Sequence, residues 1–294
     1  MSDYHWYPGH MTKARRQMQE DMKLVDLVIE LLDARIPFSS RNPDIDAMAK
    51  GKSRIVLLGK ADLADDKVTT AWLEYFKEKG IHALKLDSRN RSGVKRIDPI
   101  VQKACSEKLE RDRKRGIIGR PVRAMVAGIP NAGNSTFINS FAGKACAKTG
   151  NKPGVTKGKQ WIKLSKTLEL LDTPGILWPR FEDPMVGRNI AFIGSMNDTV
   201  LQTGELAAEL IGFLEEAYPG AIGSCYGFDT AEAASQSITR EAGILEAIAL
   251  SRRALAKGGG ADTEKAASII LDDFRSGKLG RLSVEKPDSL NFNS

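Results

Sequence analysis

Apolar and polar positions in the first part of the chain form two alternating patterns. Apolar, β-branched runs at Leu24 to Leu32, Arg54 to Leu58 and Ile81 to Leu86 are typical of buried strands. Helix-compatible stretches such as Val68 to Lys79 separate them. Because strands that alternate with helices form βαβ units, this part of the chain predicts a parallel sheet flanked by helices.

The middle of the chain adds a charged helix and two further strands. Residues Lys103 to Arg115 are dense in Lys, Arg and Glu, which predicts a solvated helix. Strand character returns from Arg120 to Gly128, directly before a glycine-rich turn, and again from Leu168 to Leu171.

Strand patterns end near residue 192, and the remaining pattern is helical. Amphipathic helices are predicted at Glu205 to Tyr218, Glu241 to Lys257 and Asp262 to Arg275. We expect the run Gly258-Gly-Gly260 to end the second helix and Asp262 to cap the third. The expected organisation is an N-terminal basic helical arm (1–22), an α/β domain (23–180), a linker (181–200) and a smaller helical domain (201–294).

Composition narrows the class of protein and of partner. A chain of 294 residues has room for an α/β domain and a smaller one, and its net charge of +7 favours an anionic partner, nucleic acid ahead of a membrane surface. Cys105, Cys146 and Cys225 form no CxxC pair, which indicates reduced thiols. With no signal peptide or membrane-length apolar run in the sequence, we expect a soluble, cytoplasmic protein.

The stretch Gly128-Ile-Pro-Asn-Ala-Gly-Asn-Ser-Thr136 has the strand-turn-helix context of a phosphate-binding P-loop. Glycines let backbone N–H groups surround a phosphate at a helix N-terminus, and Ser135 occupies the position of a magnesium-binding hydroxyl. Asn134 stands where the P-loop lysine is expected. A turn whose glycines serve packing alone is the alternative interpretation.

Two further motifs suit the same site. Asp172-Thr-Pro-Gly175 follows a predicted strand, where GTPases place a carboxylate near magnesium and a glycine N–H near the γ-phosphate. Between this motif and the P-loop, Pro153-Gly-Val-Thr156 is spaced as a switch segment whose Thr156 completes the magnesium shell. Alone, it would be an ordinary turn.

A guanine-reading loop is predicted after the strand that ends at Leu58. In Gly59-Lys-Ala-Asp62, the Asp62 carboxylate can accept the N1 and N2 hydrogens of guanine while the Lys60 stem covers the base. Gly59 replaces the usual Asn. Asp87-Ser88 supplies a candidate for the last base-contacting loop. The base-reading loops precede the phosphate loop, so the domain is a circular permutation of the usual order, which a parallel sheet permits because its ligand loops gather at one edge.

This ordered set of motifs resembles the permuted GTPases of the YlqF/YawG type. Further likeness lies in Trp6-Tyr-Pro-Gly-His-Met11, Leu32-Asp-Ala-Arg-Ile-Pro37, Ser40-Arg-Asn42, Thr173-Pro-Gly-Ile-Leu-Trp-Pro179 and Gly277-Lys-Leu-Gly-Arg281. The resemblance implies a permuted P-loop GTPase domain that acts late in large-subunit (50S) ribosome assembly, with GTP or GDP, magnesium and potassium. It also implies that hydrolysis is stimulated by the subunit.

The resemblance further assigns roles to single residues. Ser135, Thr156 and Asp172 are the expected magnesium ligands, and Asn131 matches the potassium ligand. The GTP-binding set comprises Gly59, Lys60, Ala61, Asp62, Asp87, Ser88, Asn131, Ala132, Gly133, Asn134, Ser135, Thr136, Thr156 and Gly175. Ile176 occupies the position after the DTPG motif, where no catalytic glutamine is present, and His10 matches the residue expected to orient the attacking water.

Basic residues outside the nucleotide motifs are the candidates for RNA contact. They are Lys13, Arg15 and Arg16 near the N-terminus, and Arg252, Arg253, Lys257, Lys265, Arg275, Lys278 and Arg281 near the C-terminus. The expected partners are rRNA and ribosomal proteins of the large-subunit precursor, bound by a monomer. Because Asn134 and Gly59 depart from the family pattern, the alternative is a pseudo-GTPase, an RNA-binding scaffold with impaired nucleotide binding.

Overall fold

The computed structural model describes residues 9–87, 96–142, 161–171, 183–196 and 202–289. The chain divides into two compact units. Unit 1 comprises Met1–Val186 and Ser283–Ser294, and unit 2 comprises Gly187–Leu282. The chain therefore leaves unit 1, forms unit 2 and then rejoins unit 1.

This division differs from the boundaries expected from the sequence, which placed all of 201–294 in one helical domain. The difference arises from hydrogen bonds that the C-terminal segment makes within unit 1. The N–H group of Val284 donates to the carbonyl of Arg35 at 2.8 Å, and the N–H of Asp65 donates to Ser283 Oγ at 3.1 Å. Such long-range bonds leave no periodic pattern in the sequence.

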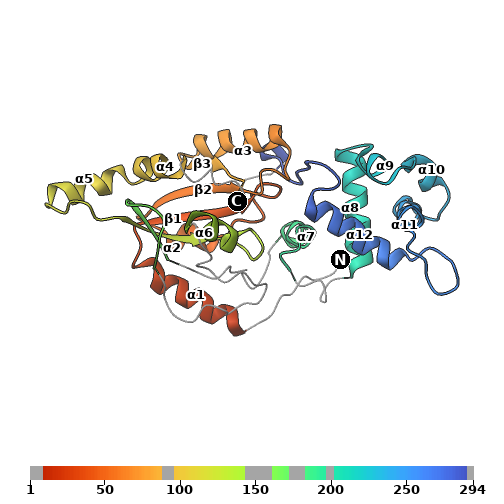
Figure 1. The fold of residues 1–294 in the computed structure, drawn as a ribbon, viewed down its shortest axis with the longest axis horizontal. Coiled ribbons are helices and arrows are strands. Elements are labelled where there is room, and N and C mark those ends of the chain that lie inside the picture. The colour runs from red at the N-terminus through yellow and green to blue at the C-terminus, as the bar shows by residue number, and fades with distance from the viewer. Residues whose placement is uncertain (1–8, 88–95, 143–160, 172–182, 197–201, 290–294) are drawn as a thin grey trace. The chain divides into compact units, whose positions relative to one another are not determined.

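Unit 1 contains, in its described part, a six-stranded sheet with the order β3-β2-β1-β4-β6-β5 (Figure 1). The strands are β1 (Leu27–Asp33), β2 (Ser53–Gly59), β3 (His82–Lys85), β4 (Val122–Ala127), β5 (Trp161–Lys163) and β6 (Leu168–Leu171). All neighbouring strands are parallel except β5, which runs antiparallel to β6. The predicted parallel sheet is confirmed, while β5 was not predicted because three residues are too few to show a pattern.

The strand order places a topological switch point between β1 and β4. From β1 the chain builds outward through β2 to β3, and then it crosses back to β4 and builds in the other direction to β6. Ligands of open α/β sheets bind beyond the carboxyl ends of the strands at such a point. Here the segments that start after Asp33 and after Ala127 meet there.

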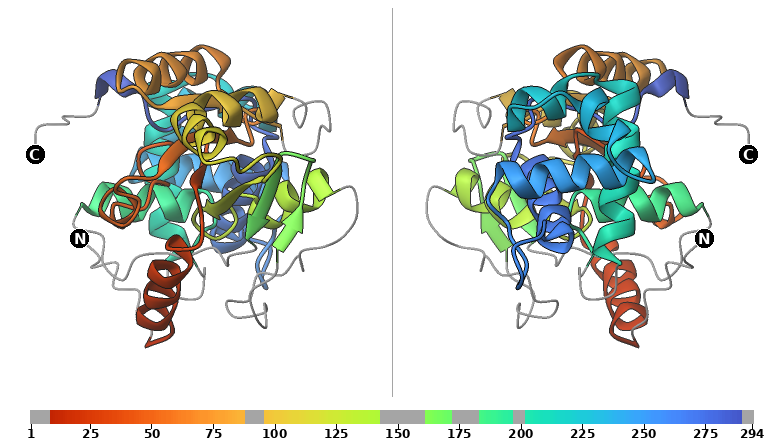
Figure 2. Two further views of the ribbon diagram at one scale, coloured as in Figure 1. Left: turned by 90° about the vertical axis from the view of Figure 1, so that its left-hand side faces the viewer. Right: turned by 90° about the vertical axis from the view of Figure 1, so that its right-hand side faces the viewer.

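The central strand β1 is buried on both faces, which explains why its sequence is hydrophobic except at Glu30 and Asp33. Leu27, Ile29 and Leu31 belong to the core cluster on one face, whereas Val28 and Leu32 belong to clusters on the other. The six described helices that lie wholly in unit 1 are α1 (Gly9–Met22), α2 (Asp44–Met48), α3 (Asp66–Glu78), α4 (Ile97–Ala104), α5 (Ser106–Lys114) and α6 (Asn134–Ala142). They include helices on both faces of the sheet (Figure 2).

Helix α3 and helix α4 show how the two faces are covered. Trp72 and Phe76 of α3 pack with Val56 of β2, and Val101 of α4 packs with Ile55, which points to the opposite face. The predicted solvated helix from Lys103 to Arg115 is confirmed as α5, which has no buried residue, but α5 begins only at Ser106. Lys103 and Ala104 instead end α4, which is buried along one side.

The described part of unit 2 consists of helices joined by loops. Helix α7 (Pro184–Phe192) crosses the boundary and is followed by α8 (Thr203–Ala217), α9 (Ala221–Tyr226), α10 (Thr230–Ser235), α11 (Arg240–Ser251) and α12 (Thr263–Ser276). In α12 the predicted cap is confirmed, because Asp262 accepts a hydrogen bond from the N–H of Lys265 at 3.0 Å. Within the described ranges, no helix is both long and apolar enough to cross a membrane.

The predicted end of α11 was wrong. The helix ends at Ser251 and not at the run of three glycines, because Arg253 adopts a left-handed backbone with φ of 54° and Ala254 is buried. The following residues form a tight turn instead, closed by an antiparallel bridge between Leu255 and Ala261.

Candidate nucleotide-binding site

The predicted P-loop connects β4 to α6 at the switch point of the sheet. Asn131 and Gly133 adopt positive φ values of 60° and 100°, a conformation that Asn and Gly tolerate best. At Gly128 a Cβ atom would lie 2.7 Å from the backbone oxygen of Leu31 and 2.7 Å from Oδ1 of Asn134. Only glycine fits there, because the loop passes directly against the end of β1.

The Asn134 side chain is held weakly within this loop. Its Nδ2 lies 3.5 Å from the carbonyl oxygen of Gly128, the outer limit for a hydrogen bond, and its buried Oδ1 has no hydrogen-bond partner among the described residues. The close packing at Gly128 and the backbone N–H groups at the N-terminus of α6 suit the binding of a phosphate group. The position that should supply a cation instead holds this neutral amide.

The predicted base-reading loop lies beside the P-loop. A Cβ atom at Gly59 would lie 3.4 Å from the carbonyl oxygen of Ala132 and 3.2 Å from Leu31 Cδ1. The N–H group of Ala61 also donates to the carbonyl of Leu86, at 3.4 Å, next to Asp87. The structure therefore brings three of the predicted loops together at the carboxyl edge of the sheet, although they are far apart along the chain.

Lys60 of this loop is fixed by a buried carboxylate that the sequence analysis did not select. Its Nζ lies 3.1 Å from Oδ2 of Asp33, the last residue of β1, and Arg35 binds both oxygens of the same carboxylate at 2.9 and 2.8 Å. Burial alone would raise the pKa of Asp33, but the charges of Arg35 and Lys60 outweigh it and hold the pKa well below its usual range. Asp33 is therefore ionised and orients Lys60.

The C-terminal segment completes this arrangement from the other end of the chain. The Glu285 carboxylate accepts hydrogen bonds from the N–H groups of Phe38, at 2.7 Å, and Ser39, at 3.1 Å, and also from the Ser39 hydroxyl. Trp72 Nε1 donates to the Glu285 carbonyl at 3.1 Å. The segment thus binds the loop that follows Asp33 and Arg35.

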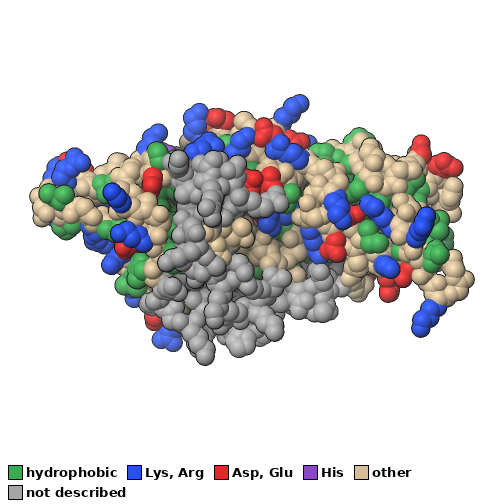
Figure 3. Space-filling model, viewed as in Figure 1, with side chains coloured by type: hydrophobic (Ala, Val, Ile, Leu, Met, Phe, Trp, Pro, Cys, Tyr) green, Lys and Arg blue, Asp and Glu red, His purple; other side chains and the backbone are tan. Residues whose placement is uncertain are grey.

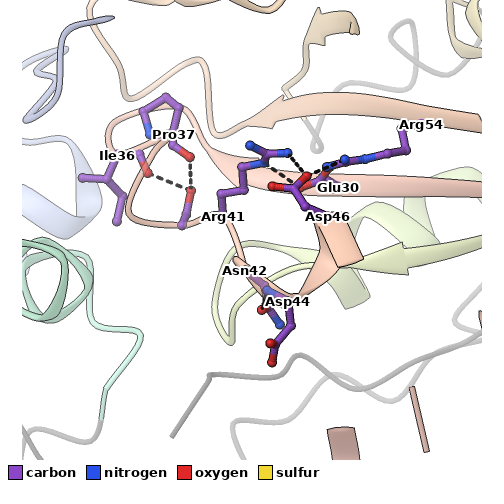
Figure 4. Close-up of polar contacts among 9 residues, drawn as sticks. Glu30, Ile36, Pro37, Arg41, Asn42, Asp44, Asp46 and Arg54 are labelled. Atoms are coloured by element: carbon purple, nitrogen blue, oxygen red, sulfur yellow. Dashed lines mark hydrogen bonds and ion pairs between the residues drawn. The ribbon is translucent and has the colours of Figure 1, made fainter. Parts of the chain in front are cut away.

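A second ionic network fixes the far side of the same loop (Figure 4). Glu30 of β1 is buried, and its carboxylate accepts from Nε of Arg41 at 3.2 Å and from Nε of Arg54 at 3.1 Å. Both arginines also bind Asp46, at 2.6 and 2.5 Å. Ser40 Oγ also donates to the Ile36 carbonyl at 2.8 Å. Together with the contacts of Glu285 and Glu30, this bond holds the loop between β1 and α2 at several positions.

Comparison with known proteins decides the family. A family model described as 50S ribosome-binding GTPase matches residues 123–216. The chain is 44% identical over 283 residues to ribosome biogenesis GTPase A of Bacillus cereus, covering 96% of this chain and 94% of that protein. It is 32% identical over 285 residues to the Thermotoga maritima protein of the same name, with 97% and 95% covered. The chain belongs to the ribosome biogenesis GTPase A family.

A solved structure supports the same assignment. The GNP-bound YlqF from T. maritima matches with a TM-score of 0.65 and 28% identity, covering 94% of this chain and 99% of that chain. The predicted YlqF resemblance and the P-loop GTPase fold are therefore confirmed. The base-reading loop of this ribosome biogenesis GTPase A family member precedes the region matched by the family model, as expected for a permuted domain.

Several predicted site residues of this family member belong to the parts of the chain outside the description. Ser88, Thr156, Asp172 and Gly175 lie outside the described residues. His10, Lys13 and Arg15 belong to α1 and Ser135 belongs to α6, but their side chains are also outside the description. Arg16 and Thr136 are exposed. The magnesium set and the His10 role consequently stay predictions.

In unit 2, the candidate RNA residues fall into two groups. Arg252 lies 4.9 Å above the Tyr226 ring and 3.4 Å from the buried carboxylate of Asp273, which Lys278 also binds at 2.7 Å. Burial and the Asp273 carboxylate, which accepts from its hydroxyl at 3.1 Å, raise the pKa of Tyr226. Arg252 and Lys278 thus have partners inside unit 2.

Arg275 also has an internal role, whereas the remaining basic residues face outward. Its guanidinium donates to the carbonyls of Phe192, at 3.1 Å, and Ala191, at 2.9 Å, and its side chain is only 16% exposed. Among the candidates that do not contact Asp273, the exposed ones are Arg253, Lys257, Lys265 and Arg281. These four are better placed than Arg275 to meet a partner.

Proposed function

We propose that this chain is a GTP-binding assembly factor that acts as a cytoplasmic monomer on the maturing large (50S) ribosomal subunit and hydrolyses GTP when docked there. The observation that carries the proposal is the meeting of the base-reading loop and the P-loop, where a Cβ at Gly59 would lie 3.4 Å from the Ala132 carbonyl. Family membership supplies the ribosomal context, since the relatives are named ribosome biogenesis GTPase A.

In this proposal the base is read by Asp62, and Lys60 covers it. Guanine presents two hydrogen-bond donors to a carboxylate, whereas adenine presents an acceptor that a carboxylate repels. Xanthine presents one donor and one acceptor, which an amide matches. We therefore expect Asp62→Asn to weaken GDP binding and to strengthen binding of xanthosine diphosphate. Unchanged selectivity between the two nucleotides would show that this loop does not read the base.

The phosphates and ions are assigned from the motifs. Backbone N–H groups of the loop from Asn131 to Thr136 would bind the phosphates, together with Gly175. Magnesium would be held by Ser135, Thr156 and Asp172, and potassium by Asn131; both ions neutralise charge that develops on the phosphates. His10 would orient the water, so His10→Ala should lower turnover without weakening GTP binding, and equal turnover in the variant would exclude that role.

The functional test is GTP turnover in magnesium and potassium, with and without purified 50S subunits. We expect little hydrolysis by the protein alone and faster hydrolysis with subunits, because the subunit would complete the catalytic site. The same rate in both conditions would contradict stimulation by the subunit. ATP should compete for the site poorly if Asp62 reads guanine.

RNA contact in unit 2 and in the N-terminal helix belongs to the same proposal. The exposed residues Arg253, Lys257, Lys265 and Arg281 would bind phosphates, with Lys13, Arg15 and Arg16 of α1. Arg253→Asn with Lys257→Gln should weaken rRNA binding, and Asn suits the positive φ at position 253. Arg252 is a poor choice for charge reversal, because a carboxylate there would face Asp273.

A second candidate function rests on Asn134. With a neutral amide at the lysine position, the chain would be an RNA-binding scaffold that binds nucleotide weakly or not at all. This alternative predicts rRNA binding without measurable GDP binding at millimolar concentrations. The first proposal predicts both.

A further inference from the structure

The α5 arm, defined as residues 106–120, is a part of unit 1 that the nucleotide site does not use. Helix α5 has no buried residue, and all side chains from Arg113 to Arg120 are exposed. Figure 1 shows α5 and the loop after it extending beyond the sheet. Only Leu109 of this helix packs against the described core, and it is partly buried, so the rest of the arm needs another explanation.

The arm is nevertheless held in a defined conformation. Lys108 and Arg120 both lie near the Asp26 carboxylate, at 3.5 and 3.6 Å, so its two ends are anchored at the start of β1. At the tip, the N–H of Gly116 donates to the Arg113 carbonyl at 3.0 Å, and the N–H of Ile117 donates to the Asp112 carbonyl at 2.9 Å. These bonds form a Schellman cap around the left-handed Gly116.

The tip combines surplus positive charge with exposed apolar side chains. Residues 106–120 contain six basic and three acidic residues. Lys108, Arg113 and Arg120 have acidic partners, whereas Arg111, Lys114 and Arg115 form no ion pair within 4 Å in the described part of the chain. Spaced by three and four positions, these three cations lie on one face of the helix end.

Two isoleucines at the tip cannot be explained by the fold. In a Schellman cap the residue after the glycine usually packs on an apolar side chain of the last turn, but here that turn presents Asp112 and Arg111. Ile117 is 41% exposed and Ile118 is 88% exposed. Cations near a helix C-terminus stabilise the helix by themselves, but the adjacent isoleucines do not. Figure 3 shows basic and hydrophobic side chains gathered at this end of unit 1.

We propose that the α5 arm is a second RNA-contact surface, separate from the helical unit. Arg111, Lys114 and Arg115 would bind phosphates, and Ile118 would make apolar contact with base or sugar edges of a structured RNA. The inference rests on the proposed ribosomal function. RNA is favoured over an acidic protein because the relatives are ribosome biogenesis proteins and the arm offers clustered cations around a small apolar tip.

The position of the arm makes this contact independent of nucleotide. The arm is anchored at the amino end of β1, whereas the P-loop and Lys60 lie at the carboxyl end. The seven residues of β1 separate the two ends by roughly 20 Å, at about 3.3 Å per residue. The arm would therefore hold RNA equally in the GDP and GTP states.

The test measures binding of the full-length protein to large-subunit rRNA transcribed in vitro, at 50 and 200 mM salt. The variant carries Arg111→Gln, Lys114→Gln and Arg115→Gln. Between 50 and 200 mM salt, the unmodified protein should lose affinity by a factor about 20 to 40 times larger than the variant does, because the variant lacks three phosphate contacts. The matched control removes three exposed lysines elsewhere in unit 1, by Lys50→Gln, Lys79→Gln and Lys163→Gln, and should change binding far less.

A second variant tests the apolar contact separately. Ile118→Ser should weaken binding by about tenfold without altering the salt dependence, and because this side chain is exposed the variant should fold normally. Both effects should be equal with GDP and with a non-hydrolysable GTP analogue.

Three outcomes would overturn the proposal. Unchanged affinity and salt dependence in both variants would exclude the arm as an RNA surface. Weaker binding to whole 50S subunits with normal binding to naked rRNA would identify a protein partner instead. If the unmodified protein bound neither rRNA nor subunits, the proposed function would fail and this inference with it, whereas failure of the arm variants alone leaves that function standing.

Discussion

Replacing Asn134 by Lys should convert a weak nucleotide site into a strong one. The present side chain contributes little to the loop, since Nδ2 is 3.5 Å from the Gly128 carbonyl and Oδ1 is buried without a partner in the described part of the molecule. Removing the Asn134 side chain should therefore cost little stability. A lysine ammonium at the start of α6 would add a charge-assisted hydrogen bond to the phosphates.

The expected gain follows from the strength of such bonds. A hydrogen bond to a charged group contributes about 1.5–3 kcal/mol, which corresponds to roughly tenfold to hundredfold tighter binding. The gain should be larger for GTP than for GDP, because the P-loop lysine reaches the β- and γ-phosphates. Without nucleotide the variant should be less stable by about 0.3–1 kcal/mol, because a cation at a helix N-terminus opposes the helix dipole.

The assay titrates fluorescent GDP and a non-hydrolysable GTP analogue, in magnesium and potassium, into both proteins. Asn134→Met is the matched control, because methionine approaches the length of lysine but carries no charge. Thermal unfolding without nucleotide provides the second readout. Equal affinity in all three proteins would refute the reasoning, and an equal gain in the Met and Lys variants would show that removal of the buried amide, and not the charge, matters.

Further predictions concern the buried groups and close contacts. Asp33→Asn should lower the free energy of unfolding, measured in urea at pH 7, by about 3–5 kcal/mol, because it breaks a buried ion pair. Since the pKa of Asp33 is depressed in the folded state, the carboxylate contributes to stability above its ordinary pKa near 4, and this contribution is lost as the pH falls below that value. The variant should therefore lose less stability between pH 5 and 3 than the unmodified protein. A lack of destabilisation at pH 7 would contradict the ion-pair geometry. Gly243→Ala should destabilise unit 2 by roughly 1–3 kcal/mol, because its Cβ would lie 2.2 Å from the Ala233 carbonyl oxygen. Gly212→Ala should instead stabilise α8 by up to about 1 kcal/mol, because its Cβ would lie 3.7 Å from the nearest atom, Oε1 of Glu241. Thermal unfolding of the two variants would measure both changes. Glu285→Ala should cost about 1–3 kcal/mol and weaken GDP binding, which a titration alongside the unmodified protein would check.

Patterns over short stretches predicted the elements that local chemistry specifies. Strand β6 lies from Leu168 to Leu171 as expected, and the face of α12 with Ala266, Ile270 and Phe274 is buried. Local patterns failed where a single backbone conformation decides the outcome. Arg253 lies just beyond the end of α11 and has a left-handed backbone. The helix therefore ends before Gly258, the first of the glycines that were expected to end it.

The candidate site was predictable as loops but not as a network. The P-loop and Lys60 were found because their motifs are contiguous in sequence. Glu285 was missed because its bonds join residues far apart in the sequence, Ser39 and Glu285 being separated by 246 positions. Asp33 pairs with nearby Arg35, but the contact with Lys60 that gives it a role at the site leaves no pattern in the sequence. The available signal for Asp33 was a charged residue at the end of an apolar strand, in Leu32-Asp-Ala-Arg, which indicates a polar group that must find partners inside the protein.

The return of the chain to unit 1 at Ser283 has a practical consequence for dissecting the protein. A fragment that stops at the end of α7 would expose the loop of Phe38 and Ser39 and would leave Trp72 without its bond to the Glu285 carbonyl. Excising unit 2 for biochemical study therefore requires rejoining the segment from residue 283 to the remainder through a linker. Viewed along the chain, the helical unit is an insertion between two pieces of one GTPase domain, and not an appendage that can be trimmed from its end.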